Sequence, residues 1–122
     1  MTDKTYGCGP IQQTVYSFDF DNTITRDPEG SLEMMKFLEK RGHTVYVCTA
    51  RPDDLFPEDL DFLRELGYKV FCTNLKAKRP YMRSQGIEVD VWIDDSPGSV
   101  VNDFPRKGAT PYTFRDMEKK TA

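Results

Sequence analysis

The chain has 122 residues, enough for one domain with its own hydrophobic core, and its apolar content of 38% is ordinary for a globular protein. The net charge of −3 provides no electrostatic basis for binding nucleic acid along the whole surface. No apolar stretch approaches the length of a membrane span, and the N-terminus lacks a signal-peptide pattern. We therefore expect a single domain over residues 1–122, with its core at about residues 14–114 and no membrane partner.

The three cysteines, Cys8, Cys48 and Cys72, do not have the spacing of a zinc site, and their odd number argues against a disulfide framework. Cys48 and Cys72 fall in predicted strands, where a small buried thiol is the expected role. A reducing, cytoplasmic environment fits this usage best.

Apolar runs and helical patterns alternate along the chain. Strands are predicted at residues 14–20, 43–49, 68–72 and 89–93, with an edge strand at 109–114. Helices are predicted at residues 31–41, 57–66 and about 80–85, with a short helical segment after Pro97-Gly98. Residues 27–30 read as a turn, and Ser31 as the cap of the first helix. The alternation predicts a three-layer α/β sandwich, in which a mainly parallel, Rossmann-like sheet carries helices on both faces.

Two of the predicted strands end in pairs of carboxylates. Asp19 and Asp21 follow the first apolar run, and Asp94-Asp95 follows the run from Val89 to Ile93. Negative charge concentrated at the rim of a sheet is costly unless a cation or a phosphate-handling site uses it. A single aspartate at a strand end is common in turns and caps, but two pairs on separate strands favour a functional site.

Further polar side chains fall at the carboxyl ends of the other strands. Thr49 ends the second strand with Arg51 just beyond it, and Lys76 and Lys78 follow the third strand. Ligands of open parallel sheets bind at these ends, at the switch point of the strand order. If the first and fourth strands are neighbours, four carboxylates converge there. Oxygen ligands without histidine or cysteine suit a hard cation such as Mg²⁺, which also bridges to phosphate.

These residues resemble the motifs of the haloacid dehalogenase superfamily. The segment Asp19-Phe20-Asp21-Asn22-Thr23 resembles its first motif, Asp-x-Asp-x-Thr, on an apolar strand. Thr49 resembles the second-motif Thr or Ser, Lys78 the third-motif Lys, and Asp94-Asp95 the paired-aspartate form of the fourth motif. The likeness spans residues 14 to about 104, and it implies a phosphatase with a haloacid dehalogenase-like fold.

The resemblance implies a role for each motif residue in phosphoryl transfer. Asp19 would be the nucleophile that forms an aspartyl-phosphate, and Asp21 the general acid and base. Thr49 would donate a hydrogen bond to the phosphoryl oxygens. Lys78 would neutralise the negative charge that accumulates in the site, and both residues would therefore contact the substrate.

The resemblance also implies the ligands of the cofactor, Mg²⁺. Asp19, the backbone carbonyl of Asp21, and Asp95 would hold the ion. Asp94 would orient Lys78 or the waters of the metal. Asp94 therefore belongs to the predicted metal site with Asp19, Asp21 and Asp95.

Some assignments stay open in the sequence. Lys76 competes with Lys78 for the role of the motif lysine; the position of Lys78 just before the predicted helix, at the spacing to Gly86 that related phosphatases show, favours Lys78. The fourth motif commonly carries another acid four or five residues after Asp95, where this chain has Ser99 and Val100.

Arg51 has two interpretations. The element Thr49-Ala50-Arg51 resembles the Ser/Thr-x-Arg of the phosphatase domain of polynucleotide kinase–phosphatase, where the Arg helps to bind phosphate. The alternative is a loop arginine that pairs with Asp53 or Asp54.

Many family members carry a cap domain, for which the predicted connections of this chain leave no room. The chain resembles in this respect the small magnesium-dependent phosphatases, which have no cap. A site without a cap suits a bulky phosphate ester, such as a nucleotide or a nucleic-acid end. Alternatively, a neighbouring subunit covers the site as a lid. We therefore expect a magnesium-dependent phosphomonoesterase, as a monomer or a small homo-oligomer. The alternative from another class is a catalytically silent module of the same fold that binds metal or phosphate.

Overall fold

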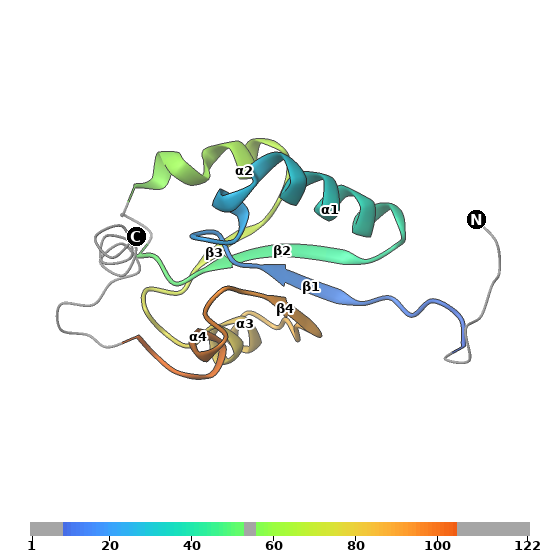
Figure 1. The fold of residues 1–122 in the computed structure, drawn as a ribbon. Helices are drawn as coiled ribbons and strands as arrows, with labels where there is room; N and C mark the ends of the chain where they lie inside the picture. The colour runs from blue at the N-terminus through green and yellow to red at the C-terminus, as the bar shows by residue number, and fades with distance from the viewer. Residues whose placement is uncertain (1–8, 53–55, 105–122) are drawn as a thin grey trace.

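The computed structural model describes residues 9–52 and 56–104, which form a parallel four-stranded sheet with the strand order β3-β2-β1-β4 (Figure 1). The strands are β1 (Val15–Phe18), β2 (Thr44–Thr49), β3 (Val70–Cys72) and β4 (Val91–Ile93). Since β1 lies between β2 and β4, the strand order reverses at β1. The predicted neighbourhood of the first and fourth strands is confirmed.

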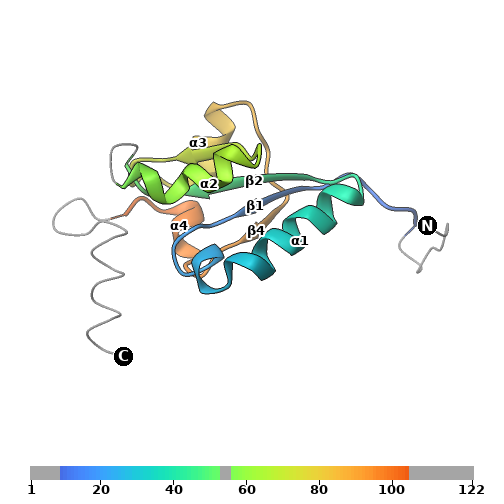
Figure 2. The same ribbon diagram turned by 90° about the horizontal axis from the view of Figure 1, so that it is seen from above.

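Helices cover both faces of the sheet. The longer helices are α1 (Pro28–Lys40), α2 (Asp61–Glu65) and α3 (Lys78–Ser84). Shorter elements are the one-turn helix α4 (Gly98–Val101) and the 3-10 helices η1 (Ile24–Arg26) and η2 (Pro57–Leu60). Figure 1 shows α1 and α2 above the sheet and α3 and α4 below it. Figure 2, seen from above, shows α2 toward one edge of the sheet and α1 toward the other, with strands visible between them. The α/β sandwich with helices on both faces is therefore confirmed.

The core has two parts, because successive residues of a strand point to opposite faces. On one face, Met35 of α1 and Leu63 of α2 pack with Phe18 and Val47 of the strands. On the other face, Met82 of α3 packs with Cys48, and Trp92 borders the cluster. A sheet that is buried on both faces accounts for the near-continuous apolar runs in the sequence.

The first helix begins earlier than the sequence predicted. Asp27 caps it, because its Oδ1 accepts a hydrogen bond of 3.0 Å from the N–H of Gly30, and Pro28 occupies the first turn. The predicted turn at residues 27–30 and the cap at Ser31 are therefore wrong. The proline fits here because its fixed φ is already helical and the first turn needs no N–H bond.

Other boundaries also shift. The strands are shorter than predicted: β2, β3 and β4 end where the sequence predicted but begin one or two residues later. β1 begins one residue later and ends two residues earlier, at Phe18. Lys78 is the first residue of α3 and does not precede it. The predicted edge strand at residues 109–114 lies outside the described residues.

The described connections at the carboxyl ends of β1 and β2 are short. From β1 to α1 the chain forms only η1, and the described residues from β2 to β3 form η2 and α2, so neither connection contains a separate cap domain. Among the residues that the structure describes, no helix is long and apolar enough to cross a membrane.

Candidate active site

Three aspartates meet at the carboxyl ends of the neighbouring strands β1 and β4. Asp19 directly follows β1, and Asp94 and Asp95 follow β4. The two strand ends are tied together by a hydrogen bond of 2.9 Å from the N–H of Asp19 to the carbonyl of Ile93. One carboxylate oxygen from each aspartate lies within 4.8 Å of the others. Residues 75 positions apart in the chain thus form one acidic cluster. It contains three of the four carboxylates that were expected to converge, and Asp21 is not a member.

Lys78 is the cation of this cluster. Its Nζ lies 2.7 Å from Oδ1 of Asp19 and 2.6 Å from Oδ2 of Asp94, and its side chain is only 2% exposed. Lys76 is exposed and lines a small surface hollow with Asn74 and Asp103. Of the two candidate lysines, Lys78 is therefore the one that contacts the acidic cluster, because the first turn of α3 directs it inward.

Asp94 and Asp95 occupy different environments. The Asp94 carboxylate accepts hydrogen bonds from Lys78, from the N–H of Ser96 (2.9 Å) and from the hydroxyl of Ser99 (3.4 Å). Asp95 is exposed, and its carboxyl group interacts with that of Asp19. Asp95 is therefore the more accessible of the two carboxylates, and Asp94 is the one that contacts Lys78.

The Thr23 hydroxyl links the two strand ends a second time. It donates to Oδ2 of Asp19 over 3.3 Å and accepts from the N–H of Asp95 over 3.2 Å. Thr23 is the last residue of the segment that resembles the first motif, and no role was predicted for it. Its motif position was the signal available in the sequence.

The electrostatics of the cluster are set by burial. Burial raises the pKa of Asp19 from 3.8 to about 8, with Lys78 opposing the shift and Asp94 adding to it. Burial alone would lower the pKa of Lys78, but Asp19 and Asp94 outweigh it and raise that pKa above its usual value. Without a cation, the carboxylates outnumber the single ammonium. Asp19 therefore holds a proton near neutral pH.

Asp21 points to a different partner. Arg51 donates two hydrogen bonds to its carboxylate, from Nε to Oδ2 (2.9 Å) and from Nη2 to Oδ1 (2.7 Å). The metal role predicted for Asp21 through its backbone carbonyl stays a prediction. The predicted alternative partners of Arg51, Asp53 and Asp54, lie outside the described residues.

Arg51 also contacts a residue that the sequence did not connect with it. Its Nη1 donates to Oδ2 of Asp59 in η2 over 2.9 Å. Burial alone would lower the pKa of Arg51, but the hydrogen bonds that it donates to Asp21 and Asp59 raise that pKa above its usual value. No local pattern in the sequence indicates this contact, because it depends on the path of the loop between β2 and η2.

Thr49 lies at the carboxyl end of β2 and is 1% exposed. Its hydroxyl oxygen accepts a hydrogen bond of 3.3 Å from the N–H of Arg51. The hydroxyl hydrogen remains available as a donor. Its predicted contact with a phosphoryl oxygen stays a prediction.

The acidic cluster fits a small divalent cation. Two oxygens bonded to one Mg²⁺ at about 2.1 Å lie at most roughly 4.2 Å apart. The three carboxylate oxygens lie within 4.8 Å of one another, so they would need to approach each other by less than about 1 Å. Carboxylates without cysteine or histidine are the ligands that Mg²⁺ prefers. Asp19, Asp94 and Asp95 could therefore hold the ion.

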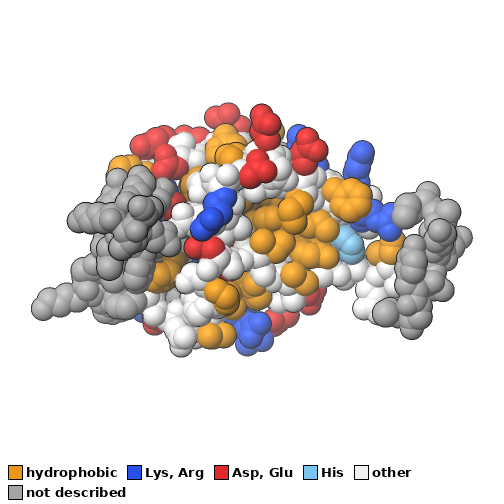
Figure 3. All heavy atoms as spheres, in the orientation of Figure 1, with side chains coloured by type: hydrophobic (Ala, Val, Ile, Leu, Met, Phe, Trp, Pro, Cys, Tyr) orange, Lys and Arg blue, Asp and Glu red, His pale blue; other side chains and the backbone are white. Residues whose placement is uncertain are grey.

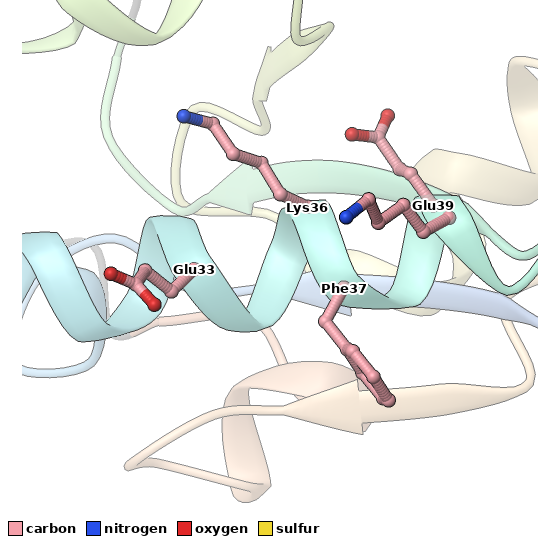
Figure 4. A pocket seen from close by; sticks show the side chains of 5 residues that line it. Glu33, Lys36, Phe37 and Glu39 are labelled. Carbon is pink, nitrogen blue, oxygen red and sulfur yellow. The ribbon is translucent and has the colours of Figure 1, made fainter.

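The outer face of α1 carries a separate surface hollow. Its lining consists of Glu33, Lys36, Phe37, Glu39 and Lys40, all from one helix (Figure 4). These residues lie away from the strand ends, so the hollow has no part in the acidic cluster. Figure 3 shows acidic side chains over α1 and α2 on this face of the molecule. That surface does not favour a polyanion, in agreement with the net charge.

Comparisons with known proteins give two curated relatives. One, from Oceanobacillus iheyensis, is 30% identical over 92 residues, which cover 72% of this chain and 48% of the relative. The other, from Bacillus cereus, is 31% identical over 71 residues, which cover 55% of this chain and 38% of the relative. Both carry the name "Putative nucleotidase". The chain thus spans about half or less of the length of these relatives.

No family model matches the chain. No solved structure matches it significantly.

Proposed function

We propose that the protein is a magnesium-dependent phosphomonoesterase of the haloacid dehalogenase type, which acts through an aspartyl-phosphate on Asp19. One observation carries the proposal. Oxygens of Asp19, Asp94 and Asp95 lie within 4.8 Å of one another, with the ammonium of Lys78 between two of these carboxylates. A buried nucleophile beside a cation site and a lysine is the arrangement that phosphoryl transfer needs.

Asp19 must lose its proton before the reaction begins. In the first half of the reaction, an oxygen of the ionised Asp19 attacks phosphorus. The new bond joins this oxygen to phosphorus, and the bond from phosphorus to the ester oxygen breaks. Asp21 must carry a proton for this step; it gives that proton to the departing oxygen, so the product leaves as a neutral alcohol. Lys78 and Thr49 offset the negative charge on the phosphoryl oxygens.

In the second half, water attacks the phosphorus of the aspartyl-phosphate. Asp21, now ionised, takes the proton of this water, and the bond between phosphorus and Asp19 breaks to release inorganic phosphate. When bound, Mg²⁺ would supply positive charge that lets two anions approach each other. Asp19, Asp95 and the backbone carbonyl of Asp21 would hold it, while Asp94 keeps Lys78 in place.

The substrate class that we propose is a nucleotide or a nucleic-acid end that carries a phosphate monoester. The names of the curated relatives support a nucleotide. The site lies at the rim of the sheet, and among the described residues the connections beside it are short, which suits a bulky ester.

Steady-state hydrolysis of an aryl phosphate with and without Mg²⁺ tests the proposal. The wild type is expected to turn over only with the ion, and Asp19→Asn is expected to be inactive. A panel of mononucleotides, 3′- and 5′-phosphorylated oligonucleotides, sugar phosphates and phosphopeptides then identifies the ester. Binding of Mg²⁺ without turnover of any ester would instead support the silent binding module.

A further inference from the structure

Arg51 is a charged residue with a side chain that is 0% exposed. A buried guanidinium must have its N–H groups satisfied. Arg51 directs Nε and Nη2 to the two oxygens of Asp21, and Nη1 to Asp59 and to the carbonyl of Phe56 at 3.4 Å. The guanidinium carbon also lies 5.2 Å from the centre of the Phe20 ring.

This arrangement argues against a direct contact between Arg51 and the substrate. Four of the five N–H groups of a guanidinium are engaged within the protein, and the side chain has no exposed surface. A phosphate group could reach Arg51 only if one of the two carboxylates released it. The interpretation of Arg51 as a phosphate ligand therefore conflicts with its position.

The backbone around Arg51 supports a dedicated role. Phe56 adopts a left-handed conformation, with φ of 47°, which costs a bulky residue free energy. This conformation precedes η2, which carries Asp59, and the Phe56 carbonyl itself accepts from Arg51. Both outer contacts of the guanidinium therefore come from one strained segment.

We propose that Asp59 and Arg51 are positioning residues for Asp21. Asp59 holds the outer edge of the Arg51 guanidinium, and the inner edge of the guanidinium holds both oxygens of Asp21. Asp21 lies in the turn after β1, beside Asn22 with φ of 63°, where a side chain lacks the support of a strand or a helix. The inference rests on the proposed function, in which Asp21 exchanges protons with the substrate.

The experiment compares Asp59→Asn, Asp59→Glu and Arg51→Lys with the wild type. The matched control is Asp61→Asn, which makes the same change at an exposed site two residues away, where the carboxylate forms an ion pair with Arg64. Three quantities are measured: kcat, the inhibition constant of inorganic phosphate, and the protected Nε–H signal of Arg51 in the NMR spectrum, assigned by its absence in Arg51→Lys. Thermal melting verifies that each variant is folded.

We expect Asp59→Asn to lower kcat roughly tenfold and Arg51→Lys up to about 100-fold, since small displacements of a catalytic group cost this much. The inhibition constant of phosphate should stay within about twofold of the wild type, because neither residue touches the substrate. The Nε–H signal of Arg51 should lose its protection in Asp59→Asn. Asp59→Glu should recover most of kcat, and Asp61→Asn should match the wild type throughout.

The inference is overturned if Asp59→Asn keeps both kcat and the protected signal. It is also overturned if Arg51→Lys mainly weakens the inhibition by phosphate, because Arg51 would then be a substrate ligand. If the wild type hydrolyses no ester, the proposed function fails by itself. The NMR comparison still decides whether Asp59 anchors Arg51.

Discussion

Lys78 joins the ends of β1 and β4, because its Nζ lies between Oδ1 of Asp19 and Oδ2 of Asp94 at 2.7 and 2.6 Å. The side chains of Asp19 and Asp94 are 8% and 3% exposed, so little water reaches these two groups and the Lys78 ammonium. Replacing one member of such a buried group leaves the others without compensation. Lys78 is thus both a structural link between two strands and the permanent cation of the proposed site.

The first prediction concerns Lys78→Met, which keeps the length of the side chain and removes its charge. We expect kcat to fall by about 10²–10³, since the charge of the phosphoryl group loses a fixed counter-charge. The metal-free variant should also unfold at lower denaturant concentration. Kinetics and urea titration measure the two effects. Lys76→Met is the control, and an equal loss of activity in Lys76→Met would contradict the assignment of Lys78.

The second prediction is that Mg²⁺ binding releases a proton. Between pH 3.8 and about 8 the folded, metal-free protein keeps a proton on Asp19 that the unfolded chain has lost. The stability of the metal-free protein therefore decreases as pH rises through this window, and Asp19→Asn should weaken that decrease. A cation must displace the proton, so its affinity should rise up to about tenfold per pH unit until pH reaches roughly 8.

Calorimetry at pH 7 in two buffers with different ionisation enthalpies measures the proton released on Mg²⁺ binding. Release of close to one proton is expected, and Asp19→Asn should release none. An affinity for Mg²⁺ that stays constant from pH 6 to pH 8 would contradict the raised pKa of Asp19.

The third prediction separates Asp94 from Asp95. Asp95 is exposed and accessible to an ion, whereas Asp94 already accepts hydrogen bonds from Lys78, Ser96 and Ser99. We expect Asp95→Asn to weaken Mg²⁺ binding by about 10- to 100-fold. Asp94→Asn should lower kcat more than it lowers the Mg²⁺ affinity. Titration of Mg²⁺ against turnover gives both values, and the reverse pattern would exchange the two roles.

The fourth prediction tests Asp21 as the proton donor. In Asp21→Asn, hydrolysis of an alkyl phosphate should fall by about 10²–10⁴, because its leaving oxygen needs a proton. The leaving oxygen of an aryl phosphate with an acidic phenol needs no proton in the first step. Stopped-flow mixing should therefore show a burst of one phenol per enzyme, followed by slow turnover. Absence of a burst, with equal losses on both esters, argues against the role.

Much of the site follows from strand topology. The carboxyl ends of parallel strands share one rim, so Asp19, Asp94 and Lys78 could be brought together from their positions after apolar runs. The contact between Arg51 and Asp59 could not be predicted, because it depends on how the chain before η2 folds back. The beginning of α1 was missed for a local reason: Pro28 reads as a turn residue as well as a first helical residue.

The central claim is that Asp19 becomes phosphorylated during turnover. Borohydride reduces an aspartyl-phosphate to homoserine, so we would quench the wild type during hydrolysis of an aryl phosphate and examine the peptide that contains residue 19 by mass spectrometry. The account predicts homoserine at position 19 only when both substrate and Mg²⁺ are present. Release of phosphate while residue 19 remains aspartate, or reduction at any other residue, would contradict it.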